Sequence, residues 1–136
     1  MNLTDLIGLR IDAAYSRFDS VFLACDTGRI VRLETVGDCC ARAFIQHIDN
    51  AQALVGAEIL DVEDLHHTAE MLAAIKADKE ESDYDESYDI WGHRFITTQG
   101  TCVFDCRTSH NGYYSGWMEA DWCDGVPAGA TPLEDR

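Results

Sequence analysis

Short segments in which apolar and polar residues alternate dominate this chain. In residues 29–35, Val31 and Leu33 alternate with polar residues, which is the period of a half-buried β-strand. Residues 21–25 are the natural partner strand, joined through a turn that ends at Gly28. Glycine supplies the positive φ that a short hairpin loop often requires. The pattern therefore predicts a β-hairpin in the first quarter of the chain.

Two more hairpins are predicted further along the chain. One joins residues 89–97 to residues 101–109 through a loop that ends at Gly100. The other turns at Asn111-Gly112, the strongest short-range hairpin dipeptide, and returns along residues 113–122. Antiparallel hairpins are thus expected to supply most of the fold.

Two segments carry helical periodicity. Residues 65–79 predict one longer helix, whose narrow apolar side is formed by Met71, Leu72 and Ile75. Residues 41–48 also place apolar side chains at helical spacing, but their short length and β-rich surroundings are typical of a strand. Periodicity leaves both alternatives open for the second segment.

An internal echo suggests duplication. Residues 5–11 resemble residues 53–59, and each segment reads as a helical turn that is stopped by glycine and leads into a strand. We therefore expect two half-repeats, 3–48 and 51–122, each with one turn and four strands. An acidic insertion at about 65–87 would then interrupt the second half.

These patterns together predict an α+β fold of mostly antiparallel β-hairpins, with one longer acidic helix inserted in the second half. A single domain is expected over residues 1–125, followed by a flexible tail over residues 126–136. The length of 136 residues and a hydrophobic content of 46% fit one domain with a real core. No apolar run approaches the ~20 residues of a membrane span. The first residues lack a basic segment followed by an apolar one, so we expect a cytoplasmic protein.

Acidic residues give the chain a net charge of -15, which repels nucleic acid and keeps a protein soluble. Residues 61–90 contain eleven acidic residues against Lys76 and Lys79. Such density favours a solvated loop. The charge serves solubility, or it binds a protein partner with a basic surface. The candidate binding residues of this acidic surface are Asp78, Glu80, Glu81, Asp83, Asp85 and Glu86.

The six cysteines are most simply reduced thiols, because their spacing shows no disulfide or C-x-x-C pattern. Cys102, Cys106 and His110 are spaced four apart, but on a strand this separates neighbours by roughly 13 Å, too far for one zinc ion. A site that draws Cys40, Cys106 and His47 from different strands stays open. His66 and His67 point apart on a helix. We expect no cofactor, no metal and no catalytic residues, and hence a protein that is not an enzyme.

Aromatic residues crowd the third predicted turn. Asn111, Tyr113, Tyr114 and Trp117 form this aromatic corner. Aromatic side chains are enriched at protein interfaces, so the corner is a candidate binding surface. Alternatively, these rings close the end of a small sheet.

Several motifs resemble a family of small phage and bacterial proteins of unknown function, the DUF7448-like family. The matching segments are Gly37-Asp38-Cys39-Cys40, Phe44-Ile45-Gln46-His47-Ile48, Leu54-Val55-Gly56, Val62-Glu63, Gly92, Ile96-Thr97-Thr98-Gln99-Gly100 and Ser109-His110-Asn111-Gly112-Tyr113-Tyr114-Ser115-Gly116. Members show an Asp-Cys-Cys corner and a Ser-Asn-Gly-Tyr-Tyr-x-Gly corner, and here His110 separates the serine from Asn111. The resemblance covers roughly residues 31–122 and implies a strand after Cys40.

The resemblance implies no chemistry, but it points to a phage-encoded accessory protein. Such a protein would act on a host protein through its acidic surface, for example as an anti-CRISPR-like inhibitor of a nucleic-acid-directed defence system. One alternative is a small-ligand-binding domain that uses a corner at Asp38, Cys39 and Cys40 together with the corner at residues 111–114. If the two halves are duplicated, these corners are equivalent and could lie close together. A second alternative is a metal- or thiol-dependent enzyme.

Overall fold

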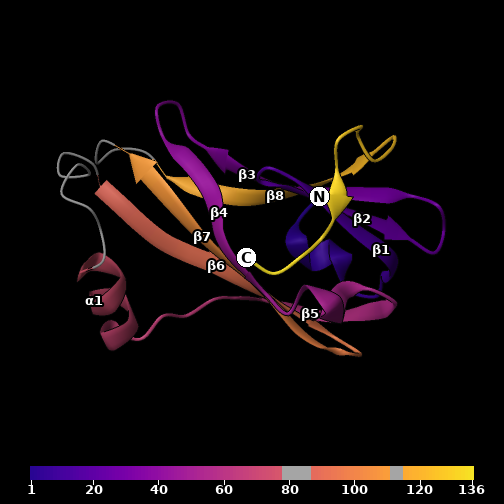
Figure 1. Ribbon diagram of the computed structural model, residues 1–136, viewed down its shortest axis with the longest axis horizontal. Coiled ribbons are helices and arrows are strands. Elements are labelled where there is room, and N and C mark those ends of the chain that lie inside the picture. The colour runs from indigo at the N-terminus through magenta and orange to yellow at the C-terminus, as the bar shows by residue number, and fades with distance from the viewer. Residues whose placement is uncertain (78–86, 111–114) are drawn as a thin grey trace.

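Nine antiparallel strands form one curved sheet in the computed structural model, which describes residues 1–77, 87–110 and 115–136 (Figure 1). Within the sheet the strand order is β4-β7-β6-β5-β1-β2-β3-β8, and β9 pairs with β1 outside this path. In chain order the elements are the 3-10 turn η1 (Leu3–Leu6), β1 (Arg10–Arg17), β2 (Ser20–Cys25), β3 (Ile30–Gly37), β4 (Arg42–Asp49), the 3-10 turn η2 (Ala51–Leu54), β5 (Ala57–Asp64), the helix α1 (Ala69–Ala77), β6 (Ser87–Thr97), β7 (Gly100–His110), β8 (Gly116–Cys123) and β9 (Thr131–Pro132).

The expected α+β class is wrong, because the described chain is mostly β and its one α-helix, α1, has nine residues. The predicted helix over residues 65–79 begins late for a local reason. The Leu65 N–H donates to the Gly92 carbonyl (2.9 Å), so the chain leaves β5 in an extended conformation. Thr68 then caps the helix, since its Oγ1 accepts a hydrogen bond from the Met71 N–H (3.1 Å). The predicted end of this helix lies outside the described residues.

The first two predicted hairpins are confirmed. β2 pairs with β3, with Val21 opposite Leu33, and β6 pairs with β7, with Thr97 opposite Gly100. Residues 42–49 form strand β4, as the family resemblance implied. A β-bulge between Ile45 and His47 explains the misleading helical periodicity of this segment. The extra residue shifts the alternation, so that Ile45 and Ile48 both enter the core.

The third predicted hairpin is wrong, because β7 and β8 follow one another along the chain without pairing. β8 pairs instead with β3, where Gly116 lies opposite Gly37, and β4 pairs with β7, where Arg42 lies opposite Ser109. Each half of the chain therefore gives its last strand to the sheet of the other half.

The strand order is symmetric under exchange of the two halves. Replacing β1, β2, β3 and β4 by β5, β6, β7 and β8, and the reverse, returns the same order read backwards. The hydrogen bonds are reciprocal as well, since the Gly8 N–H donates to Ile59 (2.8 Å) and the Gly56 N–H donates to Ile11 (2.7 Å). Both β1 and β5 carry a bulge directly after these isoleucines. A common origin of the half-repeats 3–48 and 51–122 stays a prediction. Duplication would require a symmetric strand order of this kind.

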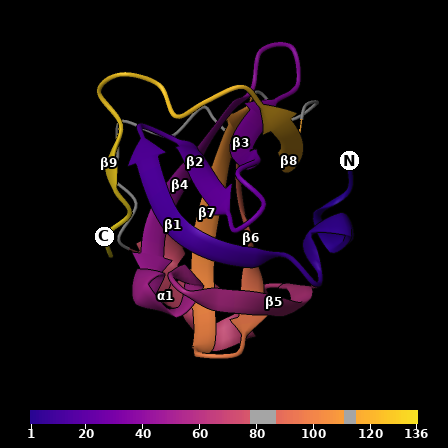
Figure 2. The same cartoon turned by 90° about the vertical axis from the view of Figure 1, so that its right-hand side faces the viewer.

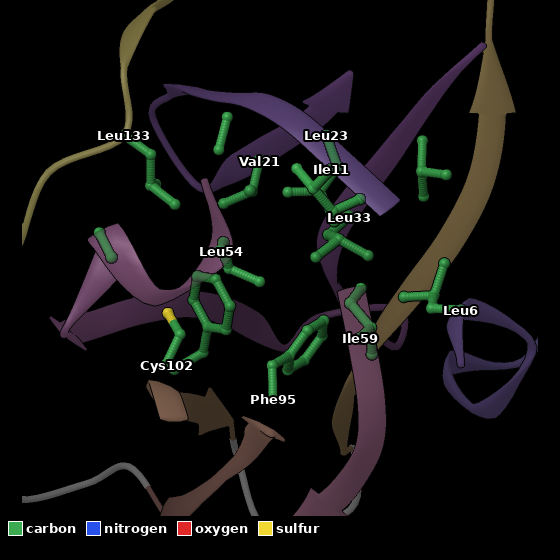
Figure 3. Packing of buried hydrophobic residues seen from close by; sticks show 14 of the residues in the cluster. Leu6, Ile11, Val21, Leu23, Leu33, Leu54, Ile59, Phe95, Cys102 and Leu133 are labelled. Carbon is green, nitrogen blue, oxygen red and sulfur yellow. The ribbon is translucent and has the colours of Figure 1, made fainter. Parts of the chain in front are cut away.

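The hydrophobic core lies inside the curve of the sheet and takes side chains from both halves (Figure 3). Leu6 and Leu54 enter it from the two equivalent turns, and both are fully buried. Phe95 and Phe104 meet edge to face in the second half, with ring centroids 5.3 Å apart. Because the two halves share one core, neither half buries its apolar residues alone.

The last residues of the chain, expected as a flexible tail, lie against the sheet (Figure 2). Leu133 donates its N–H to Ala14 of β1 (2.9 Å), and its side chain joins the core at 2% exposure. Arg136 exchanges two backbone hydrogen bonds with Ile48 of β4, both 3.0 Å long. The segment 131–136, called the C-terminal strap below, therefore bridges β1 and β4.

Removing the strap's apolar anchor should destabilise the whole domain. Leu133→Ala is expected to lower the free energy of unfolding by about 2–4 kcal/mol, the usual range for a buried leucine. Leu60→Ala is the control, because Leu60 is 48% exposed and its loss should change stability by less than about 1 kcal/mol. Urea unfolding followed by circular dichroism measures both values. Equal stability of the two variants would show that the strap does not support the core.

A side chain at Gly116 should also destabilise the fold. A Cβ built on Gly116 would overlap Thr108 Oγ1 and lie 2.9 Å from Ala43 Cβ. Gly116→Ala is expected to lower the free energy of unfolding by about 1–3 kcal/mol through overpacking. Gly125→Ala is the matched control, since a Cβ there meets nothing within 4 Å. Thermal unfolding of both variants tests the prediction, and an unchanged midpoint for Gly116→Ala would contradict it.

Candidate functional site

Most of the acidic and aromatic candidates from the sequence lie outside the described residues. This holds for all six acidic candidates and for three of the four residues of the aromatic corner: Asp78, Glu80, Glu81, Asp83, Asp85, Glu86, Asn111, Tyr113 and Tyr114. The site is therefore built below from the residues that flank them.

The Asp38–Cys40 corner is exposed and lies against Ser115, the residue that follows the corner at residues 111–114 in the sequence. The Asp38 N–H donates to the Ser115 carbonyl at 2.9 Å. Cys39 adopts a positive φ of 37°, and its Sγ lies 3.3 Å from Cys40 Sγ. The hydrogen bond with Cys39 raises the pKa of the Cys40 thiol. The corner at residues 111–114 itself lies outside the described residues, so the small-ligand hypothesis stays a prediction.

Trp117 is the member of the aromatic corner that the structure describes. It lies on β8 opposite Val36 of β3 and is 39% exposed. Its indole N–H donates to the Glu119 carboxylate (3.0 Å). This hydrogen bond holds the Trp117 ring beside the Glu119 carboxylate. The same ring lines the groove described next.

The open groove is a surface cavity of about 430 Å³ between β6, β8 and the segment that follows β5. Trp91 and His93 of β6 form one wall, and Trp117 and Met118 of β8 form the other. Asp64 stands at the end of β5, and Leu3, Leu65, His66, Ile90, Gly92 and Gly116 complete the lining. Apart from Asp64, His66 and His93, the lining residues are apolar side chains or glycine, and Asp64 is the acidic residue among them.

Trp91 and His93 are fixed in place by their partners. The Trp91 indole N–H donates to Thr108 Oγ1 of β7 (2.7 Å), and its ring meets the His93 ring edge to face. His93 Nδ1 lies 3.3 Å from Asp64 Oδ1. Burial lowers the pKa of His93, and the Asp64 carboxylate opposes this shift. The groove wall is therefore neutral, while the carboxylate at its rim is 79% exposed.

A buried ionic network anchors the segment between β5 and α1. The Arg107 guanidinium, 3% exposed, contacts the Asp105 carboxylate through two nitrogens. His67 Nε2 lies 3.2 Å from the same carboxylate. Arg107 also donates to the Cys106 carbonyl (2.8 Å). Through His67 the network holds the start of the acidic insertion against β7. Removing one member would be costly, because it would leave a buried charge unpaired.

The two buried cysteines of β7, Cys102 and Cys106, offer little nucleophilic character. All six cysteines of the chain are free, and burial raises the pKa of Cys102 and of Cys106 to about 12. These two thiols stay protonated at neutral pH, and the thiolate is the reactive form. Among the described residues no group of three His, Cys, Asp or Glu side chains is placed to hold a metal ion. The described helix is also too short and insufficiently apolar to cross a membrane.

Sequence reasoning missed Trp91, His93 and the role of Asp64. One signal was present, because Trp91 and His93 are two apart on a predicted strand and therefore share a face. The sequence did not show that β8 would lie opposite this face. The hairpin expected for β8 placed it beside β7 instead.

The family described as domain of unknown function DUF7448 matches residues 4–120. The match spans most of the chain, so the protein belongs to this family. No curated protein and no solved structure matches the chain at a significant level.

The environment of His93 predicts its titration. We expect an NMR titration midpoint below the ordinary value of 6.5, and Asp64→Asn should lower it further by removing the carboxylate that favours the charged ring. Between the folded-state pKa and 6.5 the unfolded chain binds a proton that the folded chain does not. The free energy of unfolding should therefore fall as pH decreases through this window. Asp121→Asn is the control and should leave the midpoint unchanged. A midpoint above 6.5 would contradict the burial of His93.

Proposed function

For this member of the DUF7448 family, we propose a non-enzymatic role in which the open groove and its acidic surroundings bind a basic segment of a partner protein. The observation that carries the proposal is the groove itself. Two tryptophans, Trp91 and Trp117, line a concave apolar surface whose charged lining residue is Asp64. Aromatic side chains in a recess are typical anchors of protein interfaces.

Charge selects the class of partner. Asp64 is the acidic lining residue, and further along the sequence residues 78–86 contain six acidic residues and Lys79. An acidic surface attracts basic segments and speeds their association. An aromatic face also attracts a lysine or arginine side chain directly. The expected partner therefore presents cationic side chains next to an apolar or aliphatic one.

Proteins that bind nucleic acids carry basic surfaces, so they form a natural class of partners. This agrees with the implication of the family resemblance, a phage-encoded accessory protein that inhibits a nucleic-acid-directed defence system. Such an inhibitor would occupy the surface that normally holds phosphates. Direct binding of nucleic acid by this chain is disfavoured by its net charge of -15.

A small ligand bound by the two corners is the second candidate. The observation in its favour is the contact between Asp38 and Ser115. The two candidates separate cleanly, because Asp38 does not line the open groove. Asp38→Asn should leave partner binding intact if the groove is the binding surface.

Charge reversal in the insertion tests the proposed function. The triple variant Asp83→Lys, Asp85→Lys, Glu86→Lys should lose most of the basic proteins that the immobilised wild type captures from a bacterial lysate. Capture should also disappear when salt is raised from about 50 mM to about 500 mM, since screening shortens the reach of charge. Quantitative mass spectrometry of the eluates measures both effects.

The matched control reverses three exposed carboxylates elsewhere, in Asp12→Lys, Asp26→Lys, Asp124→Lys. It changes the net charge by the same amount, and none of the three lines the groove. Capture should survive in this variant. Equal loss in both triple variants would show that only total charge matters, and salt-independent capture would contradict an electrostatic partner.

A further inference from the structure

The C-terminal strap shows how this fold accepts an added strand. It pairs with the edge of β1, where Tyr15 lies opposite Pro132 and Ser16 opposite Thr131. Leu133 donates its N–H to the Ala14 carbonyl and sends its side chain into the core. Figure 2 shows the strap on one side of β1 and the N-terminal turn on the other.

The edge of β5 is the equivalent position in the second half. The bulges of β1 and β5 follow Ile11 and Ile59, so Ala14, three residues after Ile11, corresponds to Val62. β1 and β5 pair with each other at Arg10 and Ile11, next to the axis that relates the halves. Beyond that contact the two strands separate, and the edge that faced the other strand is left without it in both β1 and β5. The strap covers it on β1.

No described segment pairs with the corresponding edge of β5. Residues 61–64 pair with β6 on their other side, within the part of the chain that the structure describes. The Val62 N–H donates to the Asp61 side chain (2.9 Å) instead of to a strand. N–H and C=O of one residue point to the same edge of a strand, so the Val62 carbonyl faces outward, as the Ala14 carbonyl does.

The open groove lies beside this edge. Val21, fully buried in the first half, corresponds to His93, which is a wall of the groove. The equivalence follows from the pairing, because Ala14 lies opposite Leu23 and the corresponding Val62 lies opposite Phe95. Val21 and His93 each come two residues before these partners, so they correspond as well. The recess that opens beside His93 is thus the counterpart of the space that Leu133 helps to fill in the first half.

We propose that residues 61–64 of β5 accept an extended, basic segment of the partner protein as an added strand, with an apolar side chain of that segment in the open groove. The inference rests on the proposed function and specifies its binding mode. Main-chain hydrogen bonds to an exposed edge supply affinity, and alternate side chains supply specificity. The strap demonstrates on β1 the geometry that the partner adopts on β5.

A second copy of this chain is not the expected occupant. The residues that follow Leu133 in the strap are Glu134 and Asp135. The edge of β5 carries Asp61, Glu63 and Asp64. Like charges would face each other across the new pair, which destabilises it. A segment with lysine or arginine at alternate positions would instead be attracted to the acidic side chains of β5.

The test uses synthetic peptides of about eight residues, within the usual range of strand lengths, with lysine and leucine at alternate positions. One comparison peptide replaces lysine with glutamate, and another keeps every side chain but carries N-methyl groups on alternate amides. Binding is measured by calorimetry with the full chain. Exchange of the Val62 and Asp64 amide protons with solvent is followed by NMR. The basic peptide should bind and slow this exchange.

N-methylation should weaken binding at least about tenfold, because it removes the hydrogen bonds that an added strand needs. Trp117→Ala should weaken binding several-fold. Trp122→Ala, on the same strand and equally exposed but away from the groove, should not.

Equal binding of the N-methylated peptide would overturn strand addition and leave the proposed function standing. Equal binding of the glutamate peptide would overturn the charge argument, and with it the proposed function. If the basic peptide fails to bind while lysate capture succeeds, strand addition on β5 is wrong. Concentration-dependent dimerisation that slows exchange at Val62 without peptide would identify a second copy as the occupant and overturn the proposal.

Discussion

The exchange of strands at the two corners is the constraint on which the rest of the structure depends. The chain crosses from β3 to β4 and from β7 to β8 at adjacent points, joined by the hydrogen bond between Asp38 and Ser115. Gly116 allows Thr108 to approach the crossing, and Thr108 in turn holds the Trp91 indole. The geometry of the open groove therefore follows from the close packing of the crossing.

The exchange also makes the two halves inseparable. β4 completes the sheet of the second half and β8 completes that of the first, so one core serves both. A scaffold with two equivalent halves offers two equivalent edges. In the first half the C-terminal strap covers the edge, whereas in the second half the chain leaves β5 for the acidic insertion. The proposed binding surface lies where the symmetry is broken.

The acidic insertion is attached through buried polar contacts. Asp105 and Arg107 form an ion pair on β7, and His67, from the segment before α1, contacts the same carboxylate. Replacing a member of such a network leaves a desolvated charge, so the anchor tolerates little change. The residues beyond the anchor carry like charges at high density. Anchor and charge are thus separate parts of one segment.

Local signals in the sequence determined the elements but not their partners. Alternation and turn glycines sufficed for β2, β3, β6 and β7, because a short loop leaves adjacent strands one way to pair. The same reasoning failed for β8, whose partner lies far away in the chain. It left β4 undecided between helix and strand, because a bulge imitates the helical period. The start of α1 was predicted too early, because helical periodicity does not register the hydrogen bond that holds Leu65 in an extended conformation.

The amino-acid sequence by itself determined the two repeated turns around Gly8 and Gly56, the strong negative charge and the membership of the family, since all three are local or additive properties. Only the tertiary structure decided which strands exchange, which edge the C-terminal strap covers, and that Trp91, His93 and Trp117 share one groove. These features depend on contacts between residues far apart in the chain. Such contacts arise when the shared core closes, and no short-range pattern encodes them.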